Sequence, residues 1–262
     1  MEGVTITLDK KELVFLAALL DEELILGVED PFFGWLAEQV EEEWKRSSAE
    51  MLDKGLISNR GGGGYEVSAE IADFIRLCCS PDIWVSVNLN KQIEGKSSFV
   101  LNLGIMNKQA VKISPGREYG TVEFSYGTYK RKESMEISNA LSISNSLKNN
   151  GVGFDIPERA FKTLSKVTAE EGLAQFKDVF QKDTLAAKSF IKALQAPQAK
   201  YLINTGSMRD NSSGMTSFVL IEGENCLWRV EYYDDRGSMV SVRSSDLADC
   251  IAKIESSIKQ GG

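Results

Sequence analysis

The order of apolar and polar residues predicts a strand and a helix at the start of the chain. Residues 4–8 alternate, and Asp9 stands three residues before Glu12, the spacing of an N-terminal capping box. Apolar residues then recur on one helical face at Leu13, Leu16, Leu20 and Leu24. We therefore expect a helix that begins after Asp9 and ends near Gly27.

A second helical stripe follows and leads into a small hairpin. Asp30-Pro31 has the form of an N-cap followed by proline at the first helical position, and the stripe continues to Gly55. Residues 56–67 then predict two short strands joined by the glycine run 61–64, the arrangement of a winged helix-turn-helix. Ser68 is expected to cap the next helix, which Pro81 closes.

The remaining chain repeats this order of helices followed by strands. Alternating segments predict one antiparallel meander at residues 83–89, 99–103, 110–113 and 120–125, and a second at 201–204, 216–221, 227–233 and 239–242. Helical patterns begin at Asp155, Thr168 and Asp183, and a final helix starts near Leu247. We predict a first half at residues 1–130, a linker at 131–154 and a second half at 155–262.

The two predicted halves also match residue by residue. At an offset of 116, the segment 74–76 (Phe-Ile-Arg) meets 190–192 (Phe-Ile-Lys), and Pro81 meets Pro197. At an offset of 119, the segment 98–101 meets 217–220, with Ser-Phe-Val-Leu in both, and Gly104 meets Gly223. The predicted fold is therefore α+β, a quasi-two-fold duplicated unit of helices and antiparallel meander, with a central sheet flanked by helices.

Composition excludes many kinds of chemistry. The chain of 262 residues contains no histidine, which removes Ser-His and Cys-His nucleophilic pairs and histidine-ligated zinc. Its 38 acidic and 30 basic residues give a net charge of −8, which disfavours nucleic acid and anionic membranes as partners. Phosphate-binding and nucleophile-elbow motifs are absent from the sequence. We expect a non-enzyme without cofactor or metal.

The four cysteines and the amino terminus bear on the cellular location. Cys78 and Cys79 are adjacent, which does not match the spacing of a zinc or redox motif, and Cys226 and Cys250 stand apart. We expect four reduced structural thiols in a cytoplasmic protein. The first residues carry no basic, apolar leader, and no stretch reaches the length of a membrane span.

Two parts of the sequence resemble the EspG-type proteins of type VII (ESX) secretion systems. The first is the run from Ala49 to Ile57, followed by a polar turn, the helix at 68–79 and the meander. The second is the closing hairpin and helix, residues 217–254. The resemblance implies a quasi-symmetric α+β fold and a cytosolic, non-catalytic chaperone that keeps a helical secretion substrate soluble and targets it for export.

The resemblance also bears on the client. The composition is rich in Lys, Ser and Asn rather than in Ala and Arg, which points to a low-GC Gram-positive host. A WXG- or LXG-type helical client is then more natural than a PE/PPE-like one, although both are kept here. No nucleic acid or membrane partner is expected.

By resemblance, the hairpin loops 90–96 and 205–215 are where such chaperones contact cargo. The second loop contains Met208 and Met215, whose flexible apolar side chains suit the tip of a client helix, beside Arg209. Trp228 and Tyr233 are aromatic candidates on a predicted central strand, where a role in the core competes with a role at an interface. These five residues form the predicted partner-binding set.

Two alternatives remain. In a winged-helix transcriptional regulator, residues 51–67 would provide a recognition helix and wing, and the second half would sense a ligand. Its weakness is the acidic run at Glu38 and residues 41–43, which outnumbers Lys45 and Arg46 and makes a poor surface for phosphates. The other alternative is a small-molecule enzyme without histidine.

Overall fold

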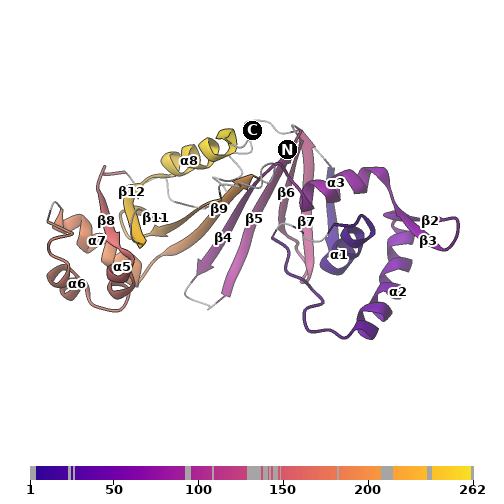
Figure 1. The fold of residues 1–262 in the computed structure, drawn as a ribbon, viewed down its shortest axis with the longest axis horizontal. Helices are drawn as coiled ribbons and strands as arrows, with labels where there is room; N and C mark the ends of the chain where they lie inside the picture. Colours follow the sequence, from indigo (N-terminus) through magenta and orange to yellow (C-terminus); the bar gives the residue numbers. More distant parts are fainter. Residues whose placement is uncertain are drawn as a thin grey trace.

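A computed structural model shows one large antiparallel sheet with helices packed on both of its faces (Figure 1). It describes residues 4–22, 25, 27–91, 96–107, 109–128, 137, 141, 143, 147, 149–181, 183–207, 215–234 and 238–260. Within these residues there are seven helices, ten strands in the main sheet and a separate two-stranded sheet. The α+β prediction is confirmed.

The strand order shows the quasi-two-fold arrangement. Each half contributes a four-stranded meander and one outer strand, and the two meanders meet side by side at the middle of the sheet. The order is β1 (Val4–Asp9), β7 (Thr121–Thr128), β6 (Gln109–Pro115), β5 (Lys96–Met106), β4 (Ile83–Lys91), β9 (Ala199–Ser207), β10 (Thr216–Glu222), β11 (Leu227–Asp234), β12 (Ser238–Ser245) and β8 (Gly153–Pro157). Joining the meanders edge to edge pairs two strands that would otherwise be exposed edges.

The junction of β4 and β9 fixes how the halves are related. The two strands are antiparallel, with Ser86 opposite Asn204 and Asn88 opposite Leu202. Because they run in opposite directions, the last described residue of β4, Lys91, and that of β9, Ser207, lie at opposite ends of the central strands. Most of the two hairpin loops singled out in the sequence lies outside the described residues.

The helices of the first half are α1 (Lys10–Leu19), α2 (Ala37–Asp53) and α3 (Ala69–Cys79). The small hairpin of β2 (Ile57–Arg60) and β3 (Gly64–Val67) projects beside them at the outer end of the molecule (Figure 1). The capping box at Asp9 and Glu12 is confirmed. Two predicted boundaries were wrong. The first helix ends at Leu19, because Asp21 adopts a left-handed conformation (φ 58°). The second helix begins at Ala37 rather than after Asp30. The Asp30 carboxylate instead accepts the Phe32 N–H (2.8 Å) in a separate turn.

In the second half, α5 (Glu158–Leu164), α6 (Ala169–Gln175) and α7 (Thr184–Gln195) precede the meander, and α8 (Leu247–Gln260) follows it. Thr168 and Asp183 cap α6 and α7 as predicted. The helix expected at Asp155 was wrong, because Asp155 and Ile156 belong to β8 and the helix starts only at Glu158. In β8, Phe154 and Ile156 are buried while their neighbours are exposed, a period of two that the short segment hid.

Three hydrophobic clusters fill the fold. One joins α1, α2 and α3 to the first-half strands, and another joins α5, α6 and α7 to the second-half strands on the same face of the sheet. The third lies on the opposite face, where Cys250 and Ile254 of α8 pack over the central strands. The outer parts of one face are therefore covered by two helical groups, and the centre of the other face by α8 (Figure 1).

Candidate functional site

The central strands present a polar surface between the two helical groups. Because side chains alternate along a strand, Val85 of β4 and Ile203 of β9 point toward α8. The opposite face carries Trp84, Ser86, Asn88, Leu202, Asn204, Gly206 and Ser217, which we call the central sheet face. The helices on this side contact strands farther out, namely β5 and β6 for α3 and β10 for α7.

The central sheet face combines amides, hydroxyls and an exposed leucine. The Asn88 side-chain amide donates to Ser86 Oγ (3.0 Å), and the Ser217 hydroxyl donates to Asn204 Oδ1 (2.7 Å). Leu202 is 41% exposed although it lies on one of the two central strands. These amides are held in place within the face, and each keeps further capacity to donate or accept hydrogen bonds.

Trp84 of β4 is the aromatic member of the central sheet face. It lies opposite Gly104 of β5 and Gly206 of β9, so neither neighbouring strand places a side chain beside it. A Cβ atom at Gly206 would lie 2.8 Å from the indole nitrogen of Trp84, so any side chain there would force the indole to move. The indole therefore lies flat across the neighbouring strand and links the central sheet face to the first-half core.

The predicted residues of the second hairpin loop are placed only in part. Met208 and Arg209 fall outside the described residues. Met215 is described, immediately before β10, and its side chain is 63% exposed. Ser217 of the central sheet face follows two residues later, so Met215 stands at the end of that surface.

The two aromatic candidates lie in different environments. Trp228 is 1% exposed and packs between Phe154 (6.2 Å between ring centroids) and Phe190 (5.4 Å), which places it in the core. We therefore leave it out of the surface considered below. Tyr233 is 38% exposed but lies on the opposite face of β11 from Trp228. The structure does not bring these two side chains together.

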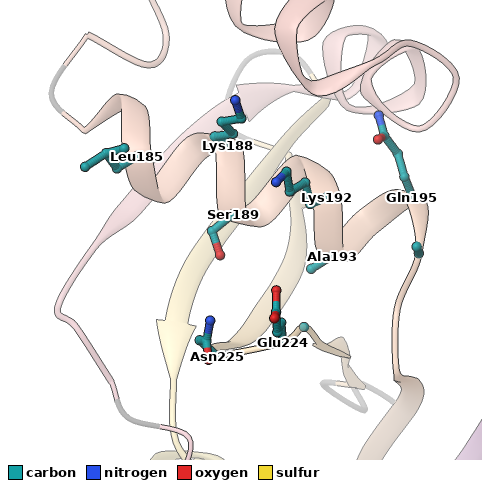
Figure 2. A pocket seen from close by; sticks show the side chains of 10 residues that line it. Leu185, Lys188, Ser189, Lys192, Ala193, Gln195, Glu224 and Asn225 are labelled. Atoms are coloured by element: carbon teal, nitrogen blue, oxygen red, sulfur yellow. The ribbon is translucent and has the colours of Figure 1, made fainter.

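Sequence reasoning missed a surface cavity of about 530 Å³ beside α7 (Figure 2). Leu185, Lys188 and Lys192 come from the helix, and Glu224 and Asn225 come from the turn after β10. Lys188 also forms an ion pair with Glu170 of α6 (2.7 Å). Lysines spaced along one helix are common on solvated surfaces, so the sequence pattern did not indicate a cavity here.

A second cavity of about 540 Å³ lies against α5 and is also basic, with Arg159, Lys162 and Lys166 in its lining. Lys162 is paired with Glu158 on the same helix, and this pair raises the pKa of the lysine. Polar and charged side chains make up most of both linings, which suits contact with a polar surface.

The four cysteine thiols are held in an unreactive form. Burial raises the pKa of Cys79 to about 12 and that of Cys250 to about 11, and it raises the pKa of Cys78 well above its usual value. All four thiols are free and buried, so they stay protonated at neutral pH. Among the described residues, no three Cys, Asp or Glu side chains group as metal ligands.

The geometry of the winged-helix-like part is unfavourable for DNA. Both basic side chains in the middle of α2 are occupied by carboxylates, Lys45 by Glu41 (2.8 Å) and Arg46 by Glu43. Residues 51–67, which were expected to provide the recognition helix and wing, form only the end of α2 and the β2–β3 hairpin. The exposed Glu38, Glu41 and Glu42 give the rest of α2 an acidic surface. Within the described part of the chain, no helix is both long and apolar enough to cross a membrane.

Comparison with known proteins places the fold. No family model matches the sequence, and no curated protein matches it. Among solved structures, the chain is similar to the type VII secretion system chaperone EspG5 of Mycobacterium tuberculosis, determined in complex with the PE25-PPE41 dimer. The TM-score is 0.65 at 14% sequence identity, and the match covers 97% of this chain and 96% of that one. The chain thus shares its whole fold with a secretion chaperone.

Proposed function

We propose that this protein is a cytoplasmic chaperone that binds a helical client non-covalently and targets it to a type VII secretion system. One observation carries the proposal, the likeness of fold to the EspG5 chaperone over nearly the full length of both chains. The lack of histidine and the protonated, buried thiols agree with a binding role rather than a catalytic one.

The central sheet face is the surface that we assign to the client. A helix laid against it would meet an apolar contact at Leu202 and side-chain amides at Asn88 and Asn204, which can bond polar groups of either kind. The platform is rigid because its strands are hydrogen-bonded on both sides and α8 packs beneath them. Such preorganisation lowers the entropy that binding must overcome.

We assign the hairpin loop after β9 to the same client contact. Met215 is exposed at the end of the central sheet face, and we assign Met208 and Arg209 to the same loop contact. Methionine adapts to clients of different shape, which suits a chaperone with more than one substrate. Tyr233, on the other face of β11, would then be reached only by a client that wraps around the sheet.

The client is proposed to be a WXG- or LXG-type helical protein, with a PE/PPE-like pair as the second possibility. The EspG5 chaperone was solved with a PE25-PPE41 dimer, which supports a helical client in general. The amino-acid composition of this chain, rich in Lys, Ser and Asn, favours the first class. Both classes present helices, so the distinction lies in the identity of the bound protein.

We further infer that the two halves arose by duplication of one unit, with residues 1–130 and 155–262 as its copies and 131–154 between them. The glycines at the two equivalent positions support this. A Cβ at Gly104 would meet Leu77 of α3, and one at Gly223 would meet Ala193 of α7. Leu77 and Ala193 are themselves 116 residues apart, the offset found for the two helices in the sequence.

The proposal is tested by affinity purification of the tagged chain from its own host, with and without nuclease, followed by mass spectrometry. A stoichiometric small helical protein that survives nuclease treatment is the expected result. Met215→Asp should then reduce its recovery while the unfolding transition stays unchanged. Recovery of DNA without a protein partner would instead support the regulator.

A further inference from the structure

A cluster of exposed apolar side chains lies where the chain enters α2. Phe33 is 91% exposed, Leu36 is 66% exposed and Trp35 is 39% exposed, and we call these three residues the entry knob. Within the described part of the chain, nowhere else do three large exposed apolar side chains fall within four residues. Figure 1 shows α2 at the outer end of the molecule, away from the central strands.

The entry knob is held in one conformation by the residues around it. The Phe32 N–H donates to the Asp30 carboxylate (2.8 Å), and the Trp35 N–H donates to the Phe32 carbonyl (2.9 Å). The Phe32 ring packs against Phe15 of α1, with 4.9 Å between centroids. Lys11 lies over the Trp35 ring (5.0 Å to its centroid). The exposed side chains are therefore presented by a fixed segment rather than by a frayed end.

The stability of the fold does not account for Leu36. It occupies the N-cap of α2, where its side chain makes no capping hydrogen bond and serine, threonine, aspartate or asparagine would be preferred. Gln39 supplies the missing contact in part, since its side-chain oxygen accepts the Leu36 N–H (2.9 Å). A residue that is both a poor cap and an exposed apolar group indicates a surface role.

Exposed acidic residues precede and follow the knob in the sequence. Glu29, Asp30, Glu38 and Glu42 are exposed, and Glu38 and Glu42 lie one turn apart at the start of α2 without an ion pair among the described residues. Like charges at this spacing repel each other. The wider region has the same sign, since residues 1–82 contain 18 acidic and 7 basic residues, whereas residues 83–262 contain 20 and 23.

We propose that the entry knob and the Glu38–Glu42 pair form a docking site for a second protein, through a segment with apolar side chains flanked by lysine or arginine. The apolar side chains would cover Phe33 and Leu36, and the basic ones would relieve the repulsion between the two glutamates. An anionic membrane or nucleic acid would instead be repelled. The site shares no residue with the central sheet face, so the protein could hold a client and a second partner together.

A displayed library of random peptides, selected on the immobilised full-length chain, tests the site even while its natural partner is unidentified. Enriched peptides should combine apolar residues with Lys or Arg. Synthetic copies should bind about tenfold or more weakly to the Phe33→Ser/Leu36→Ser variant and to the Glu38→Lys/Glu42→Lys variant. Matched controls are Tyr119→Ser, another exposed aromatic residue, and Glu66→Lys/Glu70→Lys, an exposed acidic pair of the same half. Both controls should bind like the wild type.

Leu36→Ser alone separates docking from folding, because serine is the better N-cap and should raise the unfolding midpoint while peptide binding falls. The proposal would be overturned by peptides that lack basic residues, by equal binding to the knob and control variants, or by wild-type binding to phosphatidylglycerol vesicles that the knob substitutions abolish. Concentration-dependent dimers lost in the knob variants would also overturn it, in favour of a second copy as occupant. Client recovery by the knob variants should stay unchanged, so this result is independent of the proposed chaperone function.

Discussion

Val87 of β4 lies directly opposite Ile203 of β9 at the centre of the sheet, and both side chains are fully buried. The two residues are 116 positions apart, the same offset that relates the helices before each meander. The pseudo-two-fold axis therefore passes between them, and equivalent residues of the two halves meet there. This pair joins the halves into one sheet beneath the proposed client surface.

We expect Ile203→Ala to destabilise the whole protein rather than one half. Truncation of a fully buried isoleucine leaves a cavity and costs about 2–5 kcal/mol in the free energy of unfolding. Because the pair joins both meanders, urea unfolding followed by tryptophan fluorescence should show one transition at a lower midpoint. Leu202→Ala, at the adjacent exposed position, should change stability by much less. Two separate transitions in Ile203→Ala would contradict the account.

Alanine at the two equivalent glycines should destabilise the fold for the same physical reason. A Cβ at Gly104 would lie 2.9 Å from the carbonyl oxygen of Leu77, and one at Gly223 would lie 2.9 Å from the Cβ of Ala193. Each helix would have to move away from the sheet, at a cost of about 1–3 kcal/mol. Gly61→Ala, which meets no atom within 4 Å, is the control and should be nearly neutral. Chemical denaturation of the three variants decides the matter.

The acid stability of the first half should depend on Glu43. Burial of this carboxylate opposes ionisation, but hydrogen bonds from Lys11 and Arg46 outweigh it and hold its pKa below the usual 4.5. A lowered pKa stabilises the folded protein above the unfolded value, and this contribution is lost as pH falls through the folded value.

We therefore expect Glu43→Gln to lower the free energy of unfolding at neutral pH and to make its fall between about pH 5 and pH 3 less steep. Glu38→Gln, on the exposed surface of the same helix, should change stability at neutral pH by no more than about 0.5 kcal/mol. Thermal unfolding across this pH range measures both effects. An unchanged slope in Glu43→Gln would exclude the ion-pair explanation.

The thiols provide a test of the buried, non-catalytic interpretation. With the pKa of Cys79 at about 12 and that of Cys250 at about 11, the native protein should contain almost no thiolate at pH 8. Iodoacetamide should therefore modify none of the four cysteines until denaturant is added, when all four react. A single cysteine that reacts rapidly in the native state would indicate an activated thiol, and mass spectrometry would locate it.

Much of the fold could be predicted because local signals agreed with tertiary packing. Alternating runs such as residues 83–89, the cap at Asp9 and the cap at Asp183 all lie where expected. The errors arose where one local pattern is compatible with two structures. Asp30 caps a turn rather than a helix, and β8 is a five-residue edge strand whose register is set by β12, a partner more than 80 residues away.

The candidate surface was harder to predict, because it depends on which face of the sheet is left uncovered. Periodicity placed Trp228 on a central strand but could not say that Phe154 and Phe190 would enclose it. Leucine is usually a core residue, and Leu202 is exposed because the two helical groups leave the strands between them uncovered. Such exposure depends on how the whole sheet assembles and cannot be predicted from the residue pattern of one sequence.

Binding of the client to a variant of the central sheet face tests the main claim most directly. The helical protein recovered with the wild-type chain would be titrated calorimetrically into the wild type and into Leu202→Asp, after both are shown to unfold at the same midpoint. The account predicts a stoichiometric complex that Leu202→Asp weakens by about tenfold or more. Equal affinity for both proteins would contradict it and would remove the central sheet face from the client site.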